Sequence, residues 1–100
     1  MTRPLSAVLA ELDVRDLTSE VTAIAKKHGV TIEEMWSDTH QHHVAAARFE
    51  LWHLLRDRSW SYPRIGKFAG RDHQTIMAGV RKHEARLAKG FVAELKRGAA

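Results

Sequence analysis

Five consecutive polar residues, RDHQT at 71–75, follow Gly70 and precede apolar residues at helical spacing. Carboxylate, imidazole, amide and hydroxyl groups in such a row could serve acid–base catalysis, cap a helix, or hydrogen-bond to DNA bases. Neighbouring helical side chains such as Asp72 and His73 point apart, and the sequence places no nucleophile beside them, which disfavours an enzyme. Residues 71–75 could thus cap a helix or form the DNA-reading end of one. The helices that flank these residues decide between the two interpretations.

The composition indicates one soluble globular domain. The chain has 100 residues, of which 44% are apolar and 28% charged, and it has no cysteine, so disulfides and thiolate metal sites are excluded. The first sixteen residues carry acids within their apolar stretch, which argues against a signal peptide. No apolar run approaches the roughly 18 residues of a membrane span. We therefore expect a cytoplasmic protein without membrane association.

The charge is divided unevenly along the chain. Residues 1–55 hold five Lys/Arg and eight Asp/Glu, whereas residues 56–100 hold eleven Lys/Arg and four Asp/Glu. The net charge of +4 thus conceals a basic second half. A basic surface on a small domain is typical of polyanion binding, although a solvated charged surface would give the same count.

Helical periodicity covers nearly the whole sequence, and β-type alternation is absent. We expect helices at 5–12, from Leu17 to Gly29, at 32–36, from Val44 to about Arg58, at 62–68, and from Asp72 to about Leu87. Residues 37–43 read as a polar loop. The sequence from Gly90 predicts a helical restart at Phe91, packed on its own domain or on a second copy.

Local signals support these boundaries. Thr31 and Glu34 have capping-box spacing, Ser61 is a good N-cap before Pro63, and Gly29 suits a left-handed C-cap. The expected core includes Ile76, Met77, Val80 and Leu87 of the last helix and the three tryptophans Trp36, Trp52 and Trp60.

Two helices joined by a short turn containing Gly70 have the outline of a helix-turn-helix, whose second helix presents its N-terminal residues to the major groove. Asp72 could accept from cytosine, His73 could bond a base edge, and Gln74 could pair with adenine. Thr75 could reach a phosphate or a thymine methyl. The alternative is that Asp72 is only a cap and the others are surface residues.

The stretch SYPRIGKFAGRDHQTIMAGVRK at 61–82 resembles the signature of the DNA-binding C-terminal domain of the bacterial chromosomal replication initiator DnaA. A looser similarity extends over about 21–87. The resemblance implies an all-α fold, a compact helical bundle with a helix-turn-helix of the Trp-repressor type. It implies base readout by Asp72, His73, Gln74, Tyr62 and Pro63, and phosphate contacts by Arg48, Arg56, Arg71, Thr75 and Lys82.

The chain also departs from the family pattern. The loop before the long helix has His40, His42 and His43, where the family has a basic loop with an Arg in the minor groove. These histidines could replace that contact when protonated, which would make binding depend on pH. With Asp38 they also suggest a weak metal site, but metal sites need at least three convergent donors, so we expect no metal. Gln74 replaces the family's usual Thr, and Ala78 stands where His is common.

These observations divide the chain into an N-terminal helical extension (1–20), a helix-turn-helix domain (21–88) and a helical tail (89–100). We expect sequence-specific binding to double-stranded DNA, with no cofactor, and a role in regulating replication initiation or transcription. No GxxxxGK[ST] motif is present, so we expect no nucleotide cofactor and no ATPase activity. The competing hypothesis is a protein–protein interaction module that keeps the fold and has lost specific DNA binding. The oligomeric state stays open.

Overall fold

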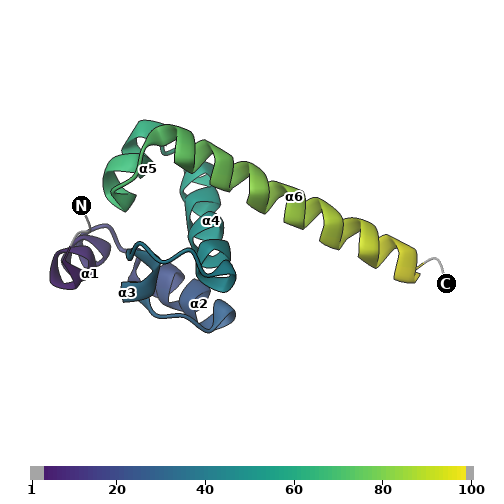
Figure 1. The fold of residues 1–100 in the computed structure, drawn as a ribbon, viewed down its shortest axis with the longest axis horizontal. Coiled ribbons are helices and arrows are strands. Elements are labelled where there is room, and N and C mark those ends of the chain that lie inside the picture. Colours follow the sequence, from purple (N-terminus) through teal and green to yellow (C-terminus); the bar gives the residue numbers. More distant parts are fainter. Residues whose placement is uncertain (1–3, 99–100) are drawn as a thin grey trace.

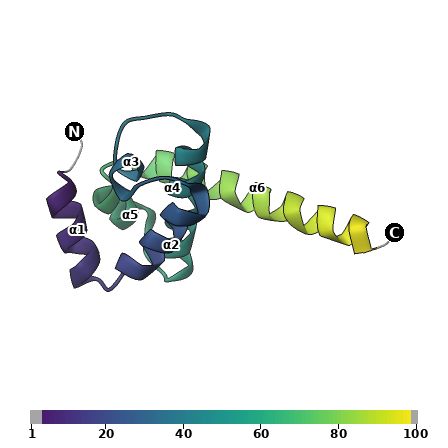
Figure 2. The ribbon, with the colours of Figure 1, turned by 90° about the horizontal axis from the view of Figure 1, so that it is seen from below.

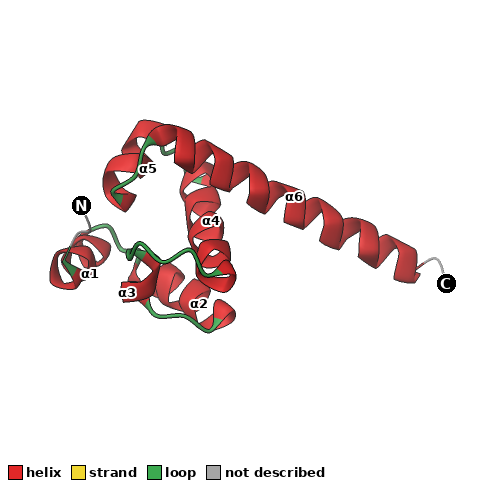
Figure 3. Ribbon diagram, in the orientation of Figure 1, coloured by secondary structure: helices red, strands yellow, loops and turns green. Residues whose placement is uncertain are grey.

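A computed structural model describes residues 4–98, with side chains described as far as Lys89. Over this range the chain forms only helices, joined by loops (Figure 3). They are α1 (Leu5–Val14), α2 (Thr18–His28), α3 (Ile32–Met35), α4 (His42–Asp57), α5 (Tyr62–Ala69) and α6 (His73–Gly98). The expectation of an all-α fold is confirmed. None of these helices is both long and apolar enough to cross a bilayer.

One hydrophobic core joins all six helices. Its centre is α4, which packs on α2 and α3 on one side and on α5 and α6 on the other. Leu51 and Leu55 of α4 are almost fully buried, as are Ile65 of α5 and Ile76 of α6. Trp36, Trp52 and Trp60 are also buried, which confirms their expected place in the core. The core thus fixes α5 and α6 on a common support.

The local helix signals in the sequence act as expected. Thr31 Oγ1 accepts from Glu34 N while Glu34 Oε1 accepts from Thr31 N, which forms the complete capping box of α3. Gly29 ends α2 in the left-handed conformation, with φ of 66°. Ser61 Oγ accepts from Arg64 N at the start of α5, and Pro63 lies in its first turn.

Three boundaries differ from expectation by two residues or more, the first being the end of α1 at Val14 instead of residue 12. The long helix begins at His42 rather than Val44, so His42 and His43 lie in its first turn. The last helix continues through Gly90 without a break. A single helical glycine costs only about 1 kcal/mol relative to alanine, too little to end a helix among strong helix formers. The expected restart at Phe91 is therefore wrong, and how its side chain packs lies outside the described residues.

The last helix, α6, also extends beyond the hydrophobic core. Figures 1 and 2 both show α6 projecting away from the other helices toward the C-terminus. The molecule measures 49 × 26 × 25 Å along its principal axes. Leu87, which we expected to be buried, is 53% exposed because it lies beyond Val80, the last buried residue of α6 among those that the structure describes.

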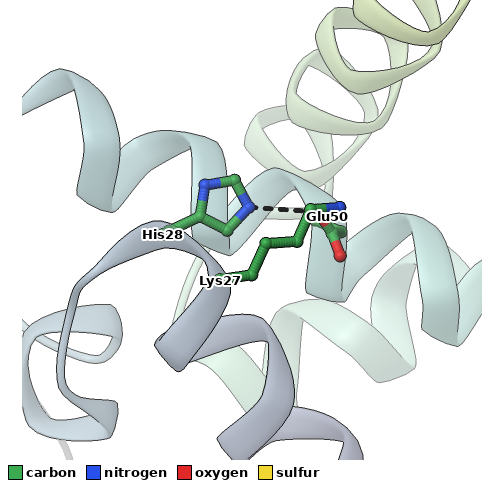
Figure 4. A network of polar contacts seen from close by, with 3 residues as sticks. All are labelled: Lys27, His28 and Glu50. Atoms are coloured by element: carbon green, nitrogen blue, oxygen red, sulfur yellow. Dashed lines mark hydrogen bonds and ion pairs between the residues drawn. The ribbon is translucent and has the colours of Figure 1, made fainter.

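A polar network ties α2 to α4 at the edge of the core (Figure 4). Lys27 Nζ and His28 Nε2 each lie 3.0 Å from Glu50 Oε1. Burial of Glu50 opposes its ionisation, but the hydrogen bonds from His28 and Lys27 outweigh that effect and lower its pKa. The network therefore favours an ionised carboxylate between the two helices.

Candidate nucleic-acid interface

The turn between α5 and α6 is held tightly against α5. Gly70 ends α5 in the left-handed conformation, with φ of 72°, which glycine adopts without steric cost. Arg71 N then donates to Gly66 O over 2.8 Å. A Cβ at position 66 would lie 2.6 Å from Arg71 O, so only glycine permits this approach of turn and helix. The turn thus sets the angle at which α6 leaves α5.

The tip of α6 carries the polar cluster of the sequence. Asp72 O accepts from Ile76 N over 3.2 Å, which places Asp72 immediately before the first helical residue. Four consecutive side chains are exposed here: Asp72, His73, Gln74 and Thr75. Ile76 directly after them is fully buried. A short polar row is therefore presented to solvent on a helix anchored in the core.

Within that row, Asp72 and His73 lie close together, so the expectation that their side chains point apart is wrong. Asp72 Oδ1 is 3.3 Å from His73 Nδ1. A carboxylate oxygen and a ring nitrogen are therefore presented side by side. Asp72 also stands immediately before the first residue of α6, a position that suits a helix cap. The start of α6 thus carries a carboxylate, an imidazole, an amide and a hydroxyl in consecutive exposed positions.

The N-terminus of α5 provides a second surface. Tyr62 is half-buried and Pro63 is exposed, both in the first turn of α5. The Arg56 guanidinium lies 4.3 Å from the centre of the Tyr62 ring, and its Nη1 donates to Trp60 O over 2.8 Å. Arg56 thus remains exposed while its position is fixed by an aromatic face and a carbonyl.

Two basic residues of α5 were not among the sequence candidates. Arg64 and Lys67 are both exposed. The Arg64 guanidinium lies 3.9 Å from the centre of the Trp60 ring, which orients it on the first helix of the motif. The signal that could have identified them is their place on the helix that crosses the DNA backbone in this motif.

The other residues expected to contact phosphate differ in their exposure and in their hydrogen bonds within the protein. Lys82 is exposed, with Nζ 5.6 Å from the centre of the Phe49 ring. Arg71 is half-buried, and its Nη2 donates to Ser37 O over 2.8 Å. Arg71 therefore links the helix-turn-helix to the loop between α3 and α4.

Arg48 has a different place from the one expected. It is only 5% exposed. Its Nε donates to Met35 O over 2.8 Å, and its Nη1 donates to Thr39 O over 2.6 Å. Its Nη2 donates to two further carbonyls of the α3–α4 segment, those of Glu34 and Ser37. The structure therefore corrects the expectation that Arg48 projects toward phosphate, because its guanidinium is enclosed by the loop backbone.

The surroundings of Arg48 also affect its ionisation. Burial, followed by repulsion from Arg71, lowers the pKa of Arg48 to about 10. The guanidinium still carries its charge at neutral pH, where the carbonyl dipoles and the nearby Asp38 carboxylate favour the charged form. Arg48 is best described as a clamp that holds residues 34–39 against α4.

The three histidines do not form one loop cluster. His40 is exposed in the loop, while His42 and His43 are exposed on the first turn of α4. His42 Nε2 lies 3.4 Å from Arg86 Nη2 of α6, away from the loop. Among the residues that the structure describes, no three His, Asp or Glu side chains are grouped so that they could hold a metal ion.

Comparison with known proteins agrees with this geometry. Residues 21–82 match the family model for the bacterial dnaA protein helix-turn-helix. A curated relative, the chromosomal replication initiator protein DnaA of Mycobacteroides abscessus, is 31% identical over 98 residues. That match covers 86% of this chain but 20% of the relative, so the chain spans about a fifth of its length. No solved structure matches the chain. Because the family model matches more than half of the chain, the chain belongs to the family of bacterial DnaA helix-turn-helix domains, which bind DNA.

Proposed function

We propose that this chain binds double-stranded DNA in a sequence-specific manner. The observation that carries the proposal is the exposed row from Asp72 to Thr75 on a helix whose next residue, Ile76, is fully buried. Base edges can be discriminated only by groups that are both free and rigidly placed. Each good base contact contributes about 1–3 kcal/mol of discrimination.

In this proposal α6 enters the major groove with its N-terminus, and α5 lies across the backbone. Asp72, His73 and Gln74 read base edges, with Tyr62 and Pro63 at the neighbouring base or its sugar. Phosphates are contacted by residues that the structure leaves exposed or half-buried: Arg56, Arg64, Lys67, Arg71, Thr75 and Lys82. Arg48 is left out of the interface because it is buried.

We further propose that binding needs no nucleotide. The sequence contains no GxxxxGK[ST] motif, and the family model that it matches is a helix-turn-helix. A chain of this kind would occupy sites of the type used by the initiator, where it competes with it or represses a neighbouring promoter. Regulation of replication initiation or of transcription follows from occupancy alone.

A second candidate function is favoured by the state of the α3–α4 loop. Residues 37–43 contain no Lys or Arg, and Arg48, the next cation, is enclosed by carbonyls. The surface that supplies a minor-groove cation in the family is therefore missing here. A protein–protein module that keeps the fold without specific DNA binding would show this loss.

Selection of bound duplexes from a random pool by the full chain separates the two functions. We expect enrichment of one motif related to the initiator's binding box. The enriched motif should change at one or two positions for the Gln74→Thr variant, because Gln74 is a proposed reader. Recovery of unrelated sequences would contradict specific binding. An absence of retained DNA even at low salt, where electrostatic binding is strongest, would favour the protein–protein module.

A further inference from the structure

Two hydrogen bonds join the α3–α4 loop to the end of α5 and the turn that follows it. Trp36 Nε1 donates to Phe68 O over 3.2 Å, and Arg71 Nη2 donates to Ser37 O over 2.8 Å. Each of the two segments thus supplies one side-chain donor and one backbone acceptor. The two bonds are therefore reciprocal, and together they form what we call the loop–turn joint.

The loop side of this joint is itself fixed. Trp36 is buried, which shields its indole N–H from water. The Trp36 ring also packs edge-on against the Phe68 ring, with centroids 5.4 Å apart. Arg48 Nη2 donates to the same Ser37 carbonyl that Arg71 contacts. The loop therefore forms a fixed support for the turn.

The other side of the joint leads directly into the tip of α6. Phe68 lies in the last turn of α5, where backbone carbonyls lack partners within the helix. Arg71 immediately precedes the exposed row of residues 72–75. Within the helix-turn-helix, Arg71 N donates to Gly66 O and holds the turn on α5. The joint adds anchors whose partners lie 32 and 34 positions apart in the sequence.

Readout of base edges depends on anchors of this kind. Functional side chains act only when they are held within about 0.5 Å and 10–20° of the productive geometry. Ile76 fixes α6 directly after the exposed row, because it is fully buried. The joint fixes the turn directly before that row. Residues 72–75 thus lie between two points of support, one of which comes from outside the helix-turn-helix.

We propose that Trp36 is a positioning residue for sequence-specific DNA binding. Together with the bond from Arg71 to Ser37, its bond to Phe68 O sets the pose of residues 72–75, while Trp36 itself stays buried and away from DNA. The inference rests on the proposed DNA-binding function and adds a residue to it. A guanidinium has five N–H donors, so Arg71 can serve the joint and contact a phosphate at the same time.

A positioning residue affects the preference between duplexes, because non-specific binding depends on phosphate contacts. The test is the ratio of affinities for a duplex with the initiator's box and a scrambled duplex, measured on the full chain with Trp36→Phe. This variant keeps an aromatic ring and removes the indole N–H. We expect the ratio to fall by about fivefold or more, the equivalent of one good base contact, with binding to the scrambled duplex unchanged.

Trp60→Phe is the matched control. The Trp60 ring packs on the Phe68 ring at the same centroid distance of 5.4 Å, whereas the hydrogen bond to Phe68 O comes from Trp36. We expect Trp60→Phe to retain the ratio of affinities. Equal falls for the two variants, or an unchanged ratio for Trp36→Phe, would overturn the proposal.

Arg71→Met tests the other half of the joint, and it carries the test alone if Trp36→Phe does not fold. This variant should lower the ratio as well, and it should also weaken binding to both duplexes through the lost phosphate contact. The double variant with Trp36→Phe should lose less than the product of the two single reductions, because both bonds act on one joint. Reductions that multiply would show two independent contacts and contradict the joint.

Hydrogen exchange of backbone amides, measured without DNA, separates this inference from the proposed function. Trp36→Phe should raise the exchange rate of the Arg71 amide, which is bonded to Gly66 O, several-fold more than that of the Val21 amide in α2. An unchanged difference between these two amides would overturn the positioning role. Absence of any box preference in the unmodified chain would contradict the proposed function instead, and exchange at Arg71 would then decide whether Trp36 positions the turn.

Discussion

The α6 tip and the α3–α4 loop differ in which part of the chain is fixed and which part is free. At the tip, Ile76 and the turn at Gly70 fix the backbone, while the side chains of residues 72–75 face solvent. In the loop, the Arg48 side chain is buried and fixes the backbone carbonyls. At the tip, the hydrogen-bonding side chains are free to bind a ligand. In the loop, the donors of Arg48 are bonded to carbonyl groups of the protein itself.

The two regions are joined at Ser37. Its carbonyl accepts from both Arg48 Nη2 and Arg71 Nη2, so one oxygen connects the loop clamp to the turn of the helix-turn-helix. Two arginines on α4 show the same contrast, because Arg48 is enclosed while Arg56 is exposed on an aromatic face. The difference predicts that Arg56, whose side chain is exposed, contributes to DNA binding, whereas the buried Arg48 contributes to the stability of the loop.

The largest effect is expected from Arg48→Ala. This change leaves the carbonyls of Glu34, Met35, Ser37 and Thr39 without their donor, which we expect to lower the free energy of unfolding by about 3 kcal/mol. Urea unfolding measures it, with Arg56→Ala as the control on the same helix and an expected loss below about 1 kcal/mol. Equal losses of unfolding free energy for the two variants would contradict the conclusion that Arg48 holds the loop while Arg56 is only a surface residue.

Gly66→Ala tests the support of the tip. The added Cβ would lie 2.6 Å from the Arg71 carbonyl oxygen, a backbone atom that cannot turn aside. We expect a loss of about 2 kcal/mol in the free energy of unfolding, although alanine is the better helix former by about 1 kcal/mol. Lys67→Ala, an exposed neighbour on α5, is the control. Stabilisation by Gly66→Ala would show that the turn does not pack on α5 as described.

Arg56→Ala should weaken DNA binding equally for all sequences. Loss of one phosphate contact is expected to cost about 1 kcal/mol and to reduce the slope of log affinity against log salt by about 1. Fluorescence anisotropy at several salt concentrations measures both quantities, with Lys26→Ala on α2 as an exposed control. A change of sequence preference instead of slope would reassign Arg56 to base readout.

The smallest expected effect is the loss of folding stability at acidic pH that Glu50 causes. The pKa of Glu50 is lower in the folded chain than in the unfolded chain. Ionised Glu50 therefore stabilises the fold at pH values above its pKa in the unfolded chain, and this stabilisation is lost as pH falls through its pKa in the folded chain. We expect urea unfolding to show a loss of about 1 kcal/mol or less between about pH 5 and about pH 3 that Glu50→Gln lacks. Glu33→Gln, an exposed change on α3, should retain the acid-dependent loss.

Local sequence signals predicted the helix ends and the turn that position the proposed DNA-binding residues. The capping box at Thr31, the cap at Ser61 and the turn at Gly70 depend on residues within a few positions of one another, and all three are seen. The anchoring of the tip by Ile76 followed from helical periodicity. These features needed no knowledge of the tertiary fold.

The failures have long-range causes. Burial of Arg48 depends on carbonyls from residues 9 to 14 positions away converging on one side chain, which spacing alone does not reveal. Exposure of Leu87 depends on where the core ends along α6, and periodicity continues regardless of that end. Continuity of α6 through Gly90 shows that a weak helix breaker does not set a boundary without a second signal.

The central claim, specific readout by the tip of α6, is tested most directly by a ratio of two affinities. The full chain is titrated against a duplex with the initiator's box and a scrambled duplex at about 150 mM salt, where non-specific binding is weak. We expect the box to be preferred by at least about a hundredfold, and His73→Ala to reduce that preference by about 1–3 kcal/mol while binding to the scrambled duplex is unchanged. Equal affinity for both duplexes, or an unchanged ratio for His73→Ala, would contradict the claim.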